Sequence, residues 1–279
     1  MRTNIKSFAV LTLAVIALGS CQKMNHPALG DYPKDANAPG GPLKFYAAMD
    51  GTTTDMLRNA VDSIRALFPS QNGGSSVDGI SGKAVQGADK TAILYPSAND
   101  FGASTSFTIS MWLKKVGNTR AEFIFSLIDD RDTWVHNSLF LMEEAGNADS
   151  TALKFYVRGQ WLAWEGDHKF KKPLADGQWH HLAISYNEAT SKLTWYFDGA
   201  AMTNAVAAVT DVKNGNNPLG PIDLSGAKGL IVAGNNQHVG QTGAGDDWIK
   251  SYTGAIDQFR LYGTLLTDAE VKALYDAKK

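Results

Sequence analysis

The segment Ser106–Lys114 reads SFTISMWLK, and the alternation of its side chains decides the fold. Successive side chains of a β-strand point to opposite faces of its sheet. Four apolar side chains therefore share one face: Phe107, Ile109, Met111 and Leu113. Three others share the opposite face: Thr108, Ser110 and Trp112. The segment predicts a strand that buries one face in a hydrophobic core.

Similar short segments follow one another along most of the chain. Turns rich in Gly, Asn and Asp separate these expected strands: 43–47, 92–95, 122–127, 138–142, 153–157, 180–186, 192–197, 230–233 and 255–262. A helix is predicted over 54–68, where apolar residues recur at helical spacing. A second helix is predicted at the C-terminus, where Thr267–Glu270 has the spacing of a capping box. We expect an all-β fold, an antiparallel two-sheet jelly-roll β-sandwich, with these two helices.

The first 21 residues indicate export. Arg2 and Lys6 precede an apolar run over 8–18, the length of a signal-peptide core and too short to span a bilayer. The sequence Leu-Gly-Ser-Cys at 18–21 resembles the lipobox of bacterial lipoproteins, which implies lipidation of Cys21. The alternative is an ordinary secretory signal followed by a chance cysteine.

These features divide the chain into a signal peptide at 1–20, a lipidated tether at 21–42 and one domain at 43–279. The tether is rich in Pro, Gly and Asn and cannot bury a core. Gln22 stands where an Asp would retain a lipoprotein in the inner membrane, so we expect an outer membrane lipoprotein on its periplasmic or cell-surface face.

Charge and cysteine content exclude several classes of protein. Without Arg2 and Lys6, the 28 acidic residues exceed the basic ones by four. A nucleic-acid partner is not expected, because it would require a basic surface. The single cysteine is assigned to the lipid, so neither a disulfide nor a thiol nucleophile is expected.

Four segments together resemble the laminin-G-like, concanavalin A-like jelly rolls. They read GKAVQG at 82–87, FTISMWL at 107–113, DGQWHHLA at 176–183 with LTWYFDG at 193–199, and YTGAIDQFRLY at 252–262. The resemblance covers residues 43–277. It implies two antiparallel sheets, one of them concave, with carbohydrate binding as the commonest role and catalysis in some branches. The helix expected over 54–68 departs from it, because the family usually has a loop there.

The resemblance also implies a structural calcium ion where the first and last strands meet. Asp50 and Asp257 match the positions that supply side chains, and the carbonyl of Gly87 could complete the set. Calcium prefers several hard oxygen ligands of this kind. In the alternative, Asp50 belongs only to a turn and Asp257 only pairs with Arg260.

The aromatic residues predict a glycan site. Sugars present apolar C–H faces to aromatic rings and hydroxyl groups to planar polar partners. Four of the 7 tryptophans lie in irregular stretches beside polar residues: Trp134, Trp161, Trp164 and Trp248. Arg131 and the set Asn235, Asn236 and His238 supply polar groups. We expect these residues to rim the concave face. As an alternative, Arg131 lies in a solvated, ion-paired loop.

No catalytic motif stands out. Related jelly-roll glucanases carry Glu-x-Asp-x-Glu on one strand, and this chain lacks it. Glu143 and Glu144 are adjacent and so would face opposite ways on a strand. We therefore predict a non-catalytic, lipid-anchored glycan-binding module for polysaccharide capture. The alternatives are a hydrolase or lyase that uses His180 and His181 or the two glutamates, and an adhesion protein that binds another protein.

Overall fold

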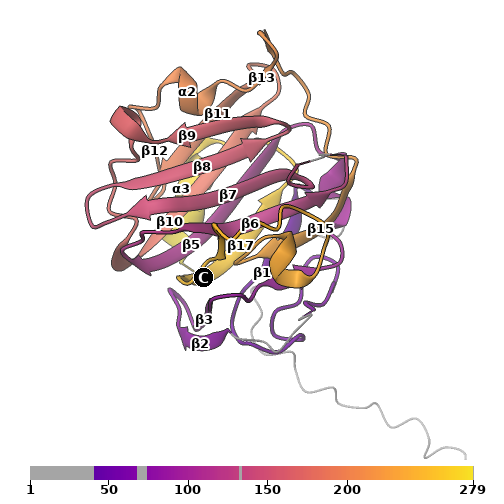
Figure 1. Cartoon of the computed structure of the whole chain (residues 1–279), viewed down its shortest axis with the longest axis vertical. Helices are drawn as coiled ribbons and strands as arrows, with labels where there is room; N and C mark the ends of the chain where they lie inside the picture. Colours follow the sequence, from indigo (N-terminus) through magenta and orange to yellow (C-terminus); the bar gives the residue numbers. More distant parts are fainter. Residues whose placement is uncertain (1–40, 68–73, 132–133, 279) are drawn as a thin grey trace, which may run out of the picture. The chain divides into compact units, whose positions relative to one another are not determined.

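Two β-sheets pack face to face in the computed structural model, which describes residues 41–67, 74–131 and 134–278 (Figure 1). In spatial order, sheet A holds β12 (Ala200–Ala201), β11 (Lys192–Phe197), β10 (Asp176–Asn187), β5 (Phe107–Val116), β17 (Ala255–Tyr262), β3 (Lys83–Gln86) and β2 (Ser75–Asp78). The first strand, β1 (Leu43–Ala47), pairs with β17. The first and last strands therefore meet, as expected.

The second sheet, sheet B, is built mainly from the middle of the chain. In spatial order, sheet B holds β4 (Ile93–Tyr95), β15 (Ala227–Val232), β6 (Ala121–Asp129), β7 (Asn137–Gly146), β8 (Thr151–Val157) and β9 (Gln160–Trp164). The short β16 (Ile249–Ser251) runs parallel to β6, whereas the other pairs are antiparallel. A separate hairpin joins β13 (Lys213–Asn214) to β14 (Asn217–Pro218). The predicted jelly-roll sandwich is confirmed.

The alternation in β5 places the core between the sheets. Its four apolar side chains, from Phe107 to Leu113, are fully buried in the main hydrophobic cluster. Trp112 faces the other way and stacks on Tyr275 of α3 (Asp268–Ala277), with ring centroids 5.5 Å apart. The capping box predicted for α3 is present, since Thr267 and Glu270 cap each other's backbone.

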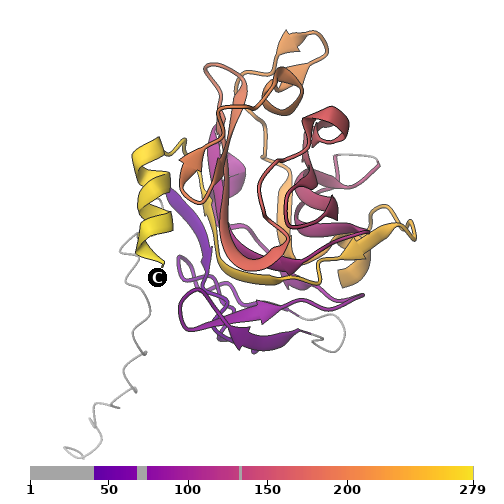
Figure 2. The ribbon, with the colours of Figure 1, turned by 90° about the vertical axis from the view of Figure 1, so that its left-hand side faces the viewer.

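The outer faces of the two sheets are covered differently. Figure 2 shows α3 against the outer side of sheet A and the loop between β15 and β16 on the opposite side of the sandwich. α3 therefore covers part of the outer face of sheet A, over Trp112 (Figure 2). No helix among the described residues is long and apolar enough to cross a bilayer.

The prediction of a helix over 54–68 is wrong for the described residues 54–67, which form separate turns. The Asn59 side chain accepts hydrogen bonds from the backbone N–H groups of Tyr46 and Val61, which competes with helical hydrogen bonding. Ser63 has a φ of 63°, a left-handed conformation that interrupts a helix. The apolar spacing reflects burial instead, since Leu57 and Val61 lie in the core. The segment is a loop, as in the family that the sequence resembles.

Candidate functional site

Three tryptophans lie together on the outer face of sheet B. Trp134 follows β6, Trp161 lies on β9 and Trp248 immediately precedes β16. The ring centroids of Trp134 and Trp248 are 6.3 Å apart with their planes at 15°, and those of Trp134 and Trp161 are 5.9 Å apart. The three residues are 46%, 39% and 42% exposed, respectively. The structure thus brings three of the four predicted aromatic residues together at the surface as a tryptophan cluster, and their contact with ligand stays a prediction.

The tryptophan cluster borders a pocket of about 360 Å³, within the size range of ligand sites. Its floor is one row of cross-strand partners, Met142 on β7, Lys154 on β8 and Ala163 on β9. Glu144 and Glu165 complete the lining. The pocket thus combines an aromatic wall with a charged edge.

A second layer of aromatic rings supports the tryptophan cluster. Phe140 stacks on Tyr156 at a centroid distance of 4.8 Å and meets the edge of Trp161 at 5.1 Å. Phe123 lies 6.1 Å from Trp248. Because Phe123, Phe140 and Tyr156 are buried, the exposed rings rest on a packed layer and are positioned before any ligand arrives.

Charged side chains meet at the edge of the pocket. The ammonium group of Lys154 lies 2.7 Å from a Glu144 carboxylate oxygen and 3.0 Å from a Glu165 carboxylate oxygen. Burial acts to lower the pKa of Lys154, but the two carboxylates outweigh it and raise the pKa above its ordinary value. Lys154 therefore stays charged at neutral pH.

The prediction that Trp164 contacts ligand is wrong. Trp164 is 1% exposed and makes edge-to-face contacts with Trp195 and Phe170 inside the sandwich. Trp161 and Trp164 lie three positions apart on β9, and residues an odd number apart on a strand face opposite sides. Since Trp161 faces out, Trp164 must face the core.

The predicted ligand contacts by Asn235, Asn236 and His238 are also wrong. Asn235 and Asn236 are buried, and Asn236 donates to the carbonyl of Thr242 at 2.5 Å. His238 Nδ1 accepts from the Asn235 backbone N–H at 3.0 Å. These residues fold the loop around the short helix η3 (Asn236–Val239) instead of lining the pocket.

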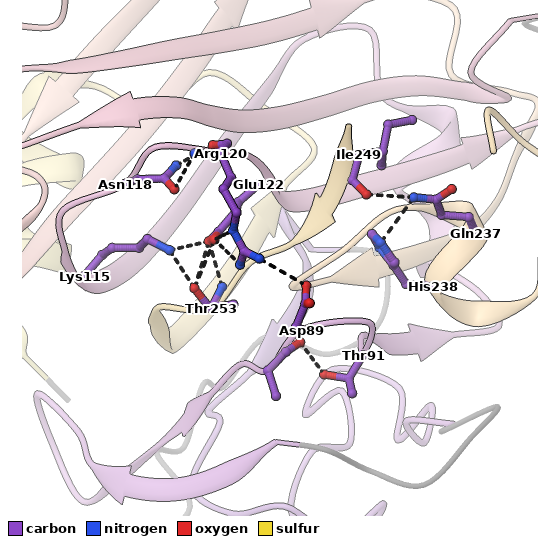
Figure 3. Close-up of polar contacts among 11 residues, drawn as sticks. Asp89, Thr91, Lys115, Asn118, Arg120, Glu122, Gln237, His238, Ile249 and Thr253 are labelled. Atoms are coloured by element: carbon purple, nitrogen blue, oxygen red, sulfur yellow. Dashed lines mark hydrogen bonds and ion pairs between the residues drawn. The ribbon is translucent and has the colours of Figure 1, made fainter. Parts of the chain in front are cut away.

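Two further contacts position the segment that carries Trp248 (Figure 3). Gln237 Nε2 donates to the carbonyl of Ile249 at 2.8 Å. Glu122, on the strand that pairs with β16, accepts from the Thr253 backbone N–H at 2.9 Å. Glu122 is itself held by Arg120, at 2.7 Å, and by Lys115. Burial acts to raise the pKa of Glu122, but these partners hold it below its ordinary value. Both flanks of β16 are thereby fixed. No sequence motif predicts this network.

Arg131 does not line the pocket, so the structure does not bring it together with the tryptophan cluster. Its guanidinium lies 2.6 Å from Asp129 and 2.7 Å from Asp223. Burial acts to raise the pKa of Asp129, but Arg131 holds it below its ordinary value. The alternative of an ion-paired loop is confirmed.

Asp50 and Asp257 both border the loop Gly79–Gly82. Asp257 Oδ2 accepts from the Ile80 backbone N–H at 2.8 Å, and Asp50 Oδ1 accepts from the Lys83 backbone N–H at 3.0 Å. Asp257 is fully buried, and its Oδ1 atom has no hydrogen-bond partner. Burial, and to a smaller extent the nearby charge of Asp50, raises the pKa of Asp257 to about 7.

This arrangement fits a divalent cation, because an orphaned buried carboxylate oxygen beside a second carboxylate suits a hard ion. Among the described residues, no three Asp, Glu, His or Cys side chains form a metal-binding group, so backbone carbonyls would have to supply the remaining ligands. The Gly87 backbone N–H donates to the carbonyl of Gly254, which immediately precedes β17 and lies three residues before Asp257. At roughly 3.3 Å of strand rise per residue, the Gly87 carbonyl lies too far from Asp257 to complete this set.

A sequence profile described as the concanavalin A-like lectin/glucanases superfamily matches residues 86–272, more than half of the chain. The chain belongs to this superfamily. Comparison with curated protein sequences gave no match.

Among solved structures, domain 4 of AbnA, an extracellular arabinanase from Geobacillus stearothermophilus in complex with arabinotriose, is similar with a TM-score of 0.53 and 19% identity over 84% of this chain and 98% of that one. Trypanosoma rangeli sialidase in complex with the inhibitor DANA has a TM-score of 0.54 and 13% identity over 97% and 39%. The binding domain of Paraclostridial Mosquitocidal Protein 1 has a TM-score of 0.53 and 16% identity over 85% and 52%. These similarities show a shared fold.

The superfamily contains both lectins and glucanases, so the placement of candidate catalytic groups matters. Glu143 is 1% exposed, and burial raises its pKa to about 7. His181 lies fully buried near Tyr275 of α3, and burial lowers its pKa to about 4. His180 binds Asp198 and Asp176 at 2.9 and 3.1 Å. None of these three residues lines the tryptophan pocket.

Proposed function

We propose that this protein is a non-catalytic glycan-binding module. The observation that carries the proposal is the convergence of Trp134, Trp161 and Trp248, from three separate segments, around one pocket with a charged edge. Sugar C–H faces would stack on the exposed rings, and hydroxyl groups would hydrogen-bond to the charged side chains. The arabinotriose complex of the similar arabinanase domain supports a carbohydrate as the ligand class.

Tryptophan fluorescence tests the proposal directly. Soluble oligosaccharides of arabinose, xylose, galactose and glucose should shift the emission of the wild-type protein, because a bound sugar removes water from the exposed indoles. In Trp161→Ala the shift should require about eightfold more oligosaccharide. In the matched variant Trp179→Phe, which changes a tryptophan outside the pocket, the shift should persist. An emission change that occurs at the same oligosaccharide concentrations in Trp161→Ala as in the wild type would count against this site.

The placement of the acids favours binding over hydrolysis. A retaining glycosidase needs one carboxylate as nucleophile and a second as general acid. In this pocket, both Glu144 and Glu165 form ion pairs with Lys154. Glu143 and His181 are buried outside the pocket.

A glycoside hydrolase is the second candidate, because Glu144 and Glu165 do share one pocket. In that case the protein would release reducing ends, and Glu144→Gln or Glu165→Gln would abolish this release while the protein still binds glycan. A binding module would release none.

We further propose a structural calcium ion between Asp50 and Asp257. It would occupy the position beside the unpartnered Oδ1 of Asp257 and join the end of the first strand to the last strand. Binding to the folded state alone would stabilise the fold by linkage.

The lipid anchor belongs to the same proposal. Cys21 and the segments 1–20 and 21–40 lie outside the described residues, so the sequence alone supports it. Radiolabelled palmitate should be incorporated into the wild-type protein but not into Cys21→Ser, and only the wild type should fractionate with the outer membrane. Tethering at a surface would raise the apparent strength of weak glycan contacts through avidity.

A further inference from the structure

The charges in the tryptophan pocket indicate which glycans it can accept, and this inference rests on the function proposed above. Lys154 is 19% exposed and lies between two more exposed carboxylates, Glu144 at 42% and Glu165 at 54%. The three groups together carry one net negative charge. The Lys154 ammonium has three N–H donors, of which two are directed to the glutamates.

The remaining hydrogen-bonding capacity suits hydroxyl groups. Each carboxylate has one oxygen that the ion pair leaves unused, and these oxygens only accept hydrogen bonds. The third N–H of Lys154 can only donate. Neighbouring sugar hydroxyls can both donate to a carboxylate and accept from an ammonium, so they match this set without disturbing it.

An acidic sugar does not match this set. A uronate, sialate or sulfate group placed at the pocket edge would meet two carboxylates and a lysine that is already neutralised. Like charges at such short distances repel strongly in a partly dehydrated site. Repulsion of this kind discriminates between ligands even where their apolar surfaces are alike.

We propose that the pocket recognises uncharged glycans through their hydroxyl groups and excludes acidic glycans, with Glu144 and Glu165 as the residues that determine this selectivity. The tryptophan cluster supplies the sugar-stacking surface, which both classes of glycan could use. The three charged side chains, Glu144, Lys154 and Glu165, discriminate between the two classes of glycan.

Affinity gel electrophoresis tests the proposal with two sets of probes. The neutral set is arabinan, xylan, galactomannan and dextran, and the acidic set is polygalacturonate, alginate and dextran sulfate. The wild type should be retarded only by neutral polysaccharides. The double variant Glu144→Gln/Glu165→Gln leaves Lys154 unneutralised and should gain at least tenfold in retardation by an acidic polysaccharide. This gain should be lost in 0.5 M salt, because salt screens exposed charges.

A matched control separates an effect of the pocket residues from an effect of the protein's net charge. Asp149→Asn/Glu188→Gln removes two acids that do not line the pocket and should gain no acidic ligand. An equal gain in this control would overturn the proposal. Unchanged thermal unfolding of both double variants would show that they fold.

Failure of this inference differs from failure of the proposed function. If an acidic polysaccharide retards the wild type and Trp161→Ala weakens this retardation, the selectivity is overturned and the glycan site is kept. If the retardation is unchanged in Trp161→Ala, or if no probe retards the wild type, both the selectivity and the proposed function are overturned.

Discussion

Replacing Trp161 by alanine should weaken glycan binding by a predictable amount. A large aromatic side chain offers up to about 250 Å² of surface, so the 39% exposure of Trp161 leaves roughly 100 Å² accessible. A stacked sugar covers one face, about half of that area. Removing roughly 50 Å² from water contributes about 1.2 kcal/mol at about 25 cal/mol per Å². Trp161→Ala should therefore raise Kd about eightfold.

The matched control is Trp164→Ala on the same strand. Trp164 packs in the core, so its replacement should cost about 3–5 kcal/mol of folding stability. The protein that remains folded should bind with unchanged Kd. Isothermal titration calorimetry gives the affinities, and urea unfolding gives the stabilities. A Trp161→Ala variant that is folded and binds normally, or a Trp164→Ala variant whose folded fraction loses affinity, would refute the assignment of faces on β9.

Three further perturbations test the polar groups. The buried Glu143 has a pKa raised to about 7, so the folded state holds a proton that the unfolded chain releases above about pH 4.5. Urea unfolding should find Glu143→Gln about 3 kcal/mol more stable than the wild type at pH 8.5 and no more stable at pH 4, and an equal effect at both would contradict this. Calcium should raise the Tm of the wild type but not that of Asp257→Asn, and no rise in the wild type would exclude the ion. Burial acts to lower the pKa of His180, but Asp198 and Asp176 outweigh it and raise the pKa above its ordinary value. The ion pairs of protonated His180 therefore stabilise the fold fully below about pH 6.5, and this stabilisation is lost as pH rises through the folded pKa. His180→Ala should therefore lose more stability at pH 6 than at pH 9, and a pH-independent loss would exclude the charged pair.

Strand positions were predictable where apolar and polar side chains alternate over several residues, as in β5. The alternation around Met111 in β5 identified the buried face, and the Thr267 capping box identified the final helix. The segment 54–67 was not predictable in the same way. Its apolar spacing suits a helix, but the Asn59 side chain binds the backbone N–H of Val61, which a helix would use, and the N–H of Tyr46 on β1. Tertiary contacts overrode local periodicity there.

The site was predictable in residue type but not in every position. Tryptophans beside polar residues indicated Trp134, Trp161 and Trp248. The same pattern also indicated Trp164, which lies in the core, and this error arose because β9 was not predicted as a strand. Had Gln160–Trp164 been treated as a strand, the odd spacing would have separated the two residues. The partners Glu144 and Lys154 come from neighbouring strands, and their contact depends on the register of β7 and β8. That register has no local signature in the sequence.

The most direct test of the central claim scores binding and turnover together. The Cys21→Ser protein, which cannot accept the lipid, would be run through gels containing the neutral polysaccharides, and the same mixtures would be assayed for reducing and unsaturated ends. A non-catalytic glycan site should give retardation by at least one polysaccharide, no released ends, and loss of retardation when Trp134, Trp161 and Trp248 are all replaced by alanine. Released ends that disappear in Glu144→Gln, or retardation that survives the triple replacement, would contradict it.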